Sequence, residues 1–128
     1  MRSTRANLAL ALLVAYMALI YYLSSGAPPR AAGLAPDYVL HGFEFGLLCA
    51  LALRAIRARG VSLRAAWLAA FALTVSYGFT DEFHQSFVPG RDASLGDLLW
   101  DAIGGLVMGA GTLMWSRLRG FSRGSPAD

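Results

Sequence analysis

Apolar runs separated by short polar segments divide the chain into four parts. An unbroken run covers residues 8–23, a second follows Asp37, a third covers 65–79 and a fourth starts near Leu95. A helix needs about 20 residues to cross a bilayer, and the first run reaches that length with its flanking residues. The other three are shorter, so their polar ends must enter the interfacial zone. The pattern predicts four transmembrane helices, at about 6–25, 37–53, 63–85 and 95–115.

Local signals mark where these helices begin and end. Residues 24–36 are rich in proline and glycine and predict a loop, after which Asp37 is placed to cap the second helix. The sequence Ser94-Leu95-Gly96-Asp97 has the form of a capping box, which predicts the start of the fourth helix. The polar tail, 116–128, is predicted to be disordered. Residues 1–128 therefore form one predicted domain.

Composition agrees with a membrane protein. Hydrophobic residues make up 56% of the chain and charged residues only 15%, and the mean hydropathy is +0.49. The single cysteine, Cys49, excludes a disulfide within the chain.

The arginines predict the orientation in the membrane. The start of the chain, the segment between the second and third helices and the tail carry nine of the eleven basic residues. Because basic loops stay in the cytoplasm, both termini are predicted to be cytoplasmic. The fold class is an all-α, multi-pass bundle of four transmembrane helices. The basic residues are too dispersed for nucleic-acid binding. A cleaved signal peptide is a second interpretation of the first run, with Ser25-Gly26-Ala27 as a small-x-small site.

This topology collects polar side chains at the outer face of the membrane. They come from the start of the second helix, the end of the third, the following loop and the start of the fourth. Charges at such a depth are tolerated where they have partners and face the bundle interior or a wet cavity. We therefore expect an outward-facing polar pocket built from His41, Glu44, Asp81, Glu82, His84, Gln85, Arg91, Asp97 and Asp101.

The residue types in this pocket suit several kinds of chemistry. Histidine–carboxylate pairs transfer protons near neutral pH, and arginine binds phosphate. The predicted catalytic residues are Glu82, His84, Asp81, His41 and Glu44. The predicted substrate-binding residues are Arg91, Gln85, Asp97 and Asp101.

Three other interpretations stay open at this point. Histidines and carboxylates also bind Zn²⁺ or harder ions, but no CxxC or HExxH spacing is present, so no metal ligand is assigned and the cofactor is unknown. Ser86 or Ser94 is available as a nucleophile, although neither lies in a G-x-S-x-G turn. In a purely structural interpretation, Arg91 pairs with Asp81 or Glu82 and Asp97 only caps the fourth helix.

The polar motif resembles a known family. The run from Asp81 to Arg91, followed by Ser94 and Asp97-Leu98-Leu99, is similar to the signature of the VanZ-like family of small bacterial membrane proteins. The segment His41–Phe45 resembles its upstream motif, and the likeness covers roughly residues 8–115. It implies a multi-pass protein of the bacterial inner membrane. Founding members are linked to resistance to glycopeptide antibiotics, teicoplanin in particular, and no reaction is implied. The family usually has asparagine where this chain has Asp101.

Together these observations predict an integral membrane protein that acts on or binds a lipid-linked or cell-envelope intermediate. Whether it is an enzyme is left open. Its expected partners are membrane lipids, and a lipid-linked phosphate or a glycopeptide in the pocket. The alternatives are a non-catalytic binder of a lipid headgroup or glycopeptide, and a structural protein whose polar cluster only holds the helices together.

Overall fold

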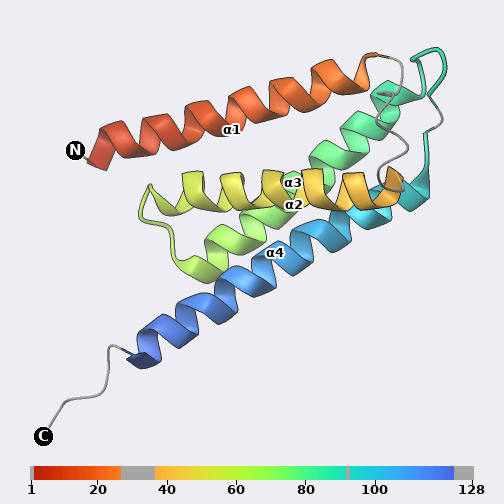
Figure 1. Ribbon diagram of the computed structural model, residues 1–128. Coiled ribbons are helices and arrows are strands. Elements are labelled where there is room, and N and C mark those ends of the chain that lie inside the picture. Colours follow the sequence, from red (N-terminus) through yellow and green to blue (C-terminus); the bar gives the residue numbers. More distant parts are fainter. Residues whose placement is uncertain (1, 27–36, 92, 123–128) are drawn as a thin grey trace, which may run out of the picture.

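The computed structural model describes residues 2–26, 37–91 and 93–122, and within these ranges the secondary structure is all helical. The helices are α1 (Arg2–Ser24), α2 (Asp37–Arg57), α3 (Leu63–Gln85) and α4 (Leu95–Ser122). Successive helices run in opposite directions, so α2 and α4 are parallel to each other (Figure 1). Helix α2 contacts each of the other three, while α1 packs on α2 and α3. The predicted all-α bundle of four helices is confirmed.

Two helices are longer than predicted at their arginine-rich ends. Helix α2 extends to Arg57 instead of ending near 53, and α4 extends to Ser122 instead of ending near 115. The prediction of a disordered tail is therefore wrong for 116–122, and residues 123–128 lie outside the described part of the chain. Arginine is a good helix former and is favoured near a helix C-terminus, so the end of an apolar run is not the end of the helix. Helix α1 also begins earlier than predicted, at Arg2.

The turn between α2 and α3 has clear local causes. Gly60 adopts φ +88°, a left-handed conformation that glycine accepts without strain, and its N–H bonds the carbonyl of Arg57. Ser62 then caps α3, and its side chain accepts the N–H of Ala65.

Glycines allow the helices to approach closely. A Cβ atom on Gly46 of α2 would lie 3.1 Å from the Gly104 carbonyl oxygen of α4, and a Cβ on Gly104 would overlap the backbone of Gly42. The small-residue pair Gly105 and Gly109 of α4 faces aromatic rings of α3 instead. Close backbone contact of this kind is typical of helix packing within membranes.

The interior and the exterior of the bundle are both apolar. Phe45, Leu48 and Ile20 are buried at the centre. Outward-facing leucines, valines and aromatic residues remain exposed on every helix, including Leu8, Phe43 and Val107. Exposed apolar surface on this scale marks an interaction surface, and here lipid is the natural contact.

Among the described residues, three helices are long and apolar enough to cross a membrane. They are Ser3–Ser24, Tyr38–Arg57 and Leu95–Trp115. Helix α3 lies outside this group. Its buried side runs from alanine through Thr74 and Gly78 to Asp81, Glu82 and Gln85, so an apolar seam becomes polar toward its C-terminus. This change along α3 places acidic and amide side chains in the interior of the bundle near the end of the helix.

Candidate functional site

The polar side chains belong to one end of the bundle, where α2 and α4 begin and α3 ends. Figure 1 shows these three helix ends on the same side of the bundle. This is the end opposite the arginine-rich turn between α2 and α3. The predicted site residues are indeed at this end, but they separate into two groups. One group faces the space between α2, α3 and α4, and the other faces the end of α1.

His41 is the centre of the first group. Its Nδ1 lies 3.1 Å from Oδ1 of Asp101, and its Nε2 lies 4.0 Å from Oδ2 of Asp97. An ionised carboxylate can only accept a hydrogen bond, so Nδ1–H donates to Asp101 and Nε2 faces Asp97. Asp101 is completely buried, at 0% exposure. Two carboxylates one helical turn apart on α4 thus hold the same imidazole from α2.

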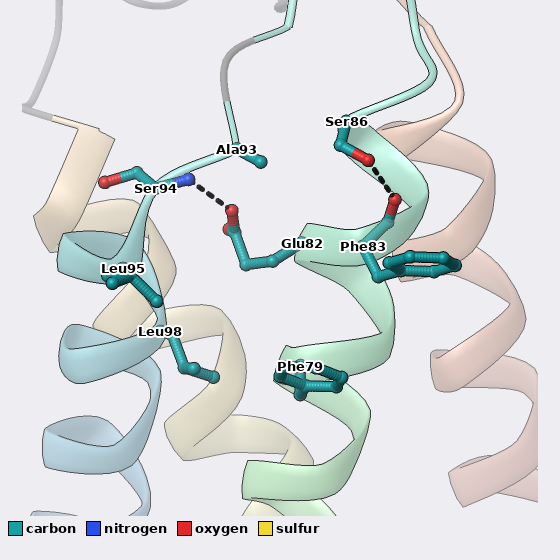
Figure 2. A pocket seen from close by; sticks show the side chains of 8 residues that line it. All are labelled: Phe79, Glu82, Phe83, Ser86, Ala93, Ser94, Leu95 and Leu98. Carbon is teal, nitrogen blue, oxygen red and sulfur yellow. Dashed lines mark hydrogen bonds between the residues drawn. The ribbon is translucent and has the colours of Figure 1, made fainter.

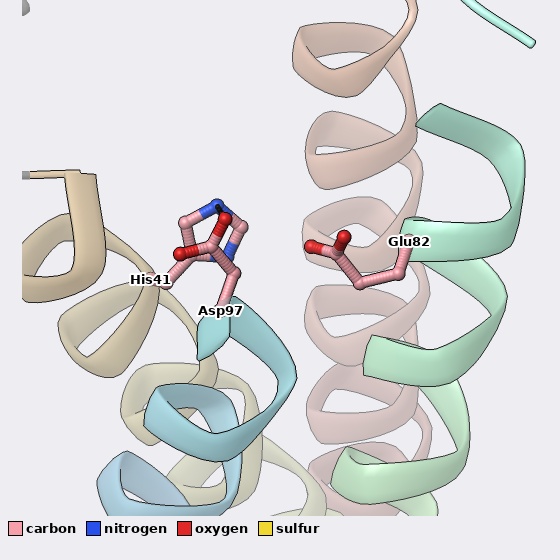
Figure 3. A group of neighbouring side chains, drawn as sticks. All are labelled: His41, Glu82 and Asp97. Carbon is pink, nitrogen blue, oxygen red and sulfur yellow. Dashed lines mark ion pairs between the residues drawn. The ribbon is translucent and has the colours of Figure 1, made fainter. Parts of the chain in front are cut away.

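Glu82 brings α3 into this group. Its Oε2 accepts the backbone N–H of Ser94 at 2.7 Å, while its Oε1 is buried and has no hydrogen-bond partner among the described residues. Figure 3 shows its carboxylate pointing toward His41 and Asp97. One ligand atom from each of these three residues lies within 4.8 Å of the others.

The start of α4 corrects the prediction for Asp97. Ser94 acts as the predicted cap, because its Oγ accepts the N–H of Gly96 at 3.1 Å. In a capping box the acid three residues later would accept the Ser94 N–H, but Glu82 of α3 takes that donor. The carboxylate of Asp97 is thereby available to His41. The interpretation of Asp97 as a cap alone is wrong.

An apolar groove opens beside Glu82. It lies between α3 and the start of α4 and has a volume of about 220 Å³ (Figure 2). Its lining consists of Phe79, Glu82, Phe83, Ser86, Ala93, Ser94, Leu95 and Leu98. Glu82 is the one carboxylate in this wall, so the groove and the polar group share a residue.

The second polar group joins α3 to α1. The amide of Gln85 donates to Oδ2 of Asp81 at 2.8 Å and to Ser24 Oγ at 3.4 Å. Nε2 of His84 lies 3.0 Å from Ser25 Oγ, and its ring lies 4.5 Å from that of Tyr21. Asp81, His84 and Gln85 therefore hold α1 against α3. His84 and Glu82, which are both predicted to be catalytic, thus lie in different groups.

Arg91 also binds α1. Its Nε donates to the carbonyl of Gly26 at 3.1 Å, and its terminal nitrogen donates to the carbonyl of Leu23 at 2.9 Å. The guanidinium thus binds carbonyls that a helix C-terminus leaves without partners, where the helix dipole also favours a cation. The expected salt bridge from Arg91 to Asp81 or Glu82 is absent from the described residues.

Glu44 lies between the two groups. It is half-buried, and its electrostatic neighbours include His41, Asp81, Asp101 and Arg91. His41 and Glu44 therefore lie close to each other on α2. The functional roles predicted for all these residues remain predictions.

Some contributors were not identified from the sequence. Ser24 and Ser25 complete the group at α1, and the backbone of Ser94 anchors Glu82. A serine near a helix end has no distinctive sequence pattern when its hydrogen-bond partner is distant in the sequence. The sequence predicts one pocket that includes His41, Glu82 and Asp97, but it does not show that these three approach one another, because that depends on the rotation of three separate helices.

Comparisons with known proteins give one match. The family model described as VanZ/LLP1 matches residues 37–117, which include α2, α3 and most of α4. The chain has no significant match among curated proteins or among solved structures.

Proposed function

The chain belongs to the VanZ/LLP1 family, and from this membership we propose that it is an integral protein of the bacterial cytoplasmic membrane that binds a lipid-linked cell-envelope intermediate. The polar headgroup would lie at His41, Glu82 and Asp97, and the apolar chain would lie in the groove between α3 and α4. Binding of this kind would place the protein where glycopeptides of the teicoplanin type meet their targets.

The observation that carries the proposal is the position of Glu82. This residue belongs to the wall of the apolar groove and to the histidine–carboxylate group at once. A lipid-linked intermediate has the same two parts, a hydrocarbon chain joined to a polar head. Sites for such ligands combine a mostly apolar lining with a few polar groups that fix orientation.

The distribution of arginines supports an orientation in the membrane that suits this role. Arg54, Arg57, Arg59 and Arg64 lie around the turn between α2 and α3, at the end opposite the polar groups. By the positive-inside rule that turn would be cytoplasmic, together with both ends of the chain, and the polar groups would face outward at headgroup depth. In this arrangement α3 would also cross the membrane, with its polar end shielded by α1, α2 and α4.

Reporter fusions test this orientation. A phosphatase that is active only outside the cytoplasm should be inactive when fused after Asp128 and active when fused after Gly90. The reverse pattern would contradict the proposed orientation. Blotting for the fusion proteins controls for unequal expression.

Native mass spectrometry tests lipid binding. Protein extracted from bacterial membranes in mild detergent should retain a lipid with a polar head. Leu95, which lines the groove at 84% exposure, is the residue to change. Leu95→Trp should fill the groove and reduce retention severalfold.

The matched control is Leu106→Trp. Leu106 is an exposed leucine about three turns further along the same side of α4, and it does not line the groove. Retention in this variant should equal that of the wild type. Equal retention in both variants, or no lipid on the wild type, would refute the proposal and favour a purely structural role for the polar groups.

A further inference from the structure

Three side chains from three helices have the composition and spacing of a metal site. We propose that His41 of α2, Glu82 of α3 and Asp97 of α4 together bind one divalent transition-metal ion, with Zn²⁺ and Mn²⁺ as the expected class (Figure 3). This inference goes beyond the proposed lipid binding and does not depend on it. In this arrangement the metal ion, and not the His41 side chain alone, would bind the ligand or react with it.

The distances suit a shared ion after a modest rearrangement of the side chains. Zinc lies about 2.0–2.2 Å from nitrogen and oxygen ligands, so two ligands of one tetrahedral ion are about 3.3–3.6 Å apart. The ligand atoms of His41, Glu82 and Asp97 lie within 4.8 Å of one another. Binding would therefore draw them together by about 1 Å at most contacts, which side-chain rotation can supply.

Asp101 prepares His41 for this role. Metal-binding histidines usually donate their other ring N–H to a carboxylate or carbonyl, which fixes the tautomer and orients the ring. Here Nδ1 lies 3.1 Å from Asp101 Oδ1, and Nε2 lies on the side of Asp97, 4.0 Å from its Oδ2.

Glu82 supplies the independent indication of a ligand. The residue is 7% exposed, and its Oε1 is buried without a hydrogen-bond partner among the described residues. Its other oxygen is held by the Ser94 N–H, which aims the carboxylate at His41 and Asp97. Burial of an unpaired charged oxygen is costly, and a cation would compensate for it.

The ligand types favour a transition metal over Ca²⁺ or Mg²⁺. Imidazole suits Zn²⁺ and its neighbours, and carboxylates extend the range to Mn²⁺. Calcium takes six to eight oxygen ligands, which this group does not offer. Three protein ligands would leave a coordination position open, as in catalytic zinc sites, for water or for an oxygen of a phosphate. The positive charge of the bound ion would also offset the repulsion between this acidic group and an anionic headgroup.

Metal titration of the purified protein is the direct test. The full-length protein in mild detergent is stripped with a chelator, dialysed and loaded separately with Zn²⁺ and with Mn²⁺. Elemental analysis after removal of free metal should find about one ion per chain for at least one of the two. No retained metal in either case would overturn the proposal.

Variants then assign the metal to these residues. Asp97→Asn and Glu82→Gln preserve shape, and each should weaken metal affinity by about tenfold or more, while Asp101→Ala should weaken it by about 10–100-fold. His84→Ala is the matched control, because His84 is the other histidine of the chain and bonds Ser25 of α1. It should bind metal as the wild type does. Equal affinity in the wild type, Asp97→Asn and Glu82→Gln would refute the assignment.

Thermal melts with and without Zn²⁺ give a second measurement. The metal should raise the melting temperature of the wild type and of His84→Ala, and this shift should be smaller in Asp97→Asn at the same metal concentration. A variant that fails to fold is recognised by its melt without metal, and the remaining variants then decide the assignment. A wild-type protein that retains about one metal ion per chain but no lipid in native mass spectrometry would refute the lipid proposal and leave the metal proposal standing.

Discussion

Replacement of Gly104 by alanine should prevent α2 and α4 from packing as they do. The added Cβ would overlap the carbonyl oxygen of Gly42 and lie 2.7 Å from its carbonyl carbon. Those atoms belong to the backbone and cannot rotate away, so the two helices would have to separate. Overpacking of a core costs about 1–3 kcal/mol and occasionally more, and a backbone clash belongs at the upper end.

Gly111→Ala is the matched control for this change. Gly111 lies further along the same helix, and a Cβ there would meet no atom within 4 Å. Alanine favours a helix over glycine by about 1 kcal/mol, so this variant should be neutral or slightly more stable. Thermal unfolding in detergent, followed by tryptophan fluorescence, compares the two. Similar melting temperatures for Gly104→Ala and the wild type would show that α2 and α4 are further apart than described.

The same change should also disturb the polar group. Gly42 directly follows His41, and Gly104 lies one turn after Asp101, so the glycine contact sets the distance between this histidine and its carboxylates. Separation of the helices would lengthen the 3.1 Å contact between His41 and Asp101. The backbone contact is therefore a requirement for the site as well as for the fold.

The number and approximate position of the helices could be predicted because apolar run length has a direct physical meaning in a membrane. The predicted bounds of α3, 63–85, coincide with the observed Leu63–Gln85. The errors fall where arginine follows an apolar run, at the ends of α2 and α4. Hydropathy indicates where a segment leaves the hydrocarbon layer of the membrane. A helix continues beyond that point as long as the following residues have a high helix propensity.

The grouping of the site residues could not be predicted in the same way. Polar residues surround the end of α3, so helical periodicity shows which of them share a side but not which neighbouring helix each side faces. On a helix, the i, i+3 spacing places Asp81 with His84 and Glu82 with Gln85. In the structure Asp81 bonds Gln85, and Glu82 alone turns to α4. The rotation of α3 is set by its buried small residues Ala66, Ala70 and Thr74, which pack against the other helices.

Loss of the His41 side chain should destabilise the protein far more than loss of His84. Asp101 is fully buried, and the His41 ring is the one hydrogen-bond partner of its side chain among the described residues. His41→Ala would leave that carboxylate buried and unpaired. Removal of one member of a buried ion pair costs about 3–5 kcal/mol.

His84→Ala removes a histidine from a more exposed position. Its ring bonds Ser25 near the end of α1, where water can replace it. A hydrogen bond of this kind contributes about 0.5–1.5 kcal/mol, so the melting temperature should fall only slightly. Equal destabilisation by the two histidine variants would contradict the central position of His41.

Two further variants distinguish destabilisation by the unpaired Asp101 carboxylate from destabilisation by a simple loss of packing. The double variant His41→Ala/Asp101→Ala removes both partners, and it should be more stable than His41→Ala, because no buried charge is left alone. His41→Asn keeps a donor close to the position of Nδ1 but lacks Nε2. It should therefore recover much of the stability while metal binding stays lost. This pair of results would establish that the two nitrogens of His41 have different tasks, one holding α2 to α4 through Asp101 and the other completing the site with Glu82 and Asp97.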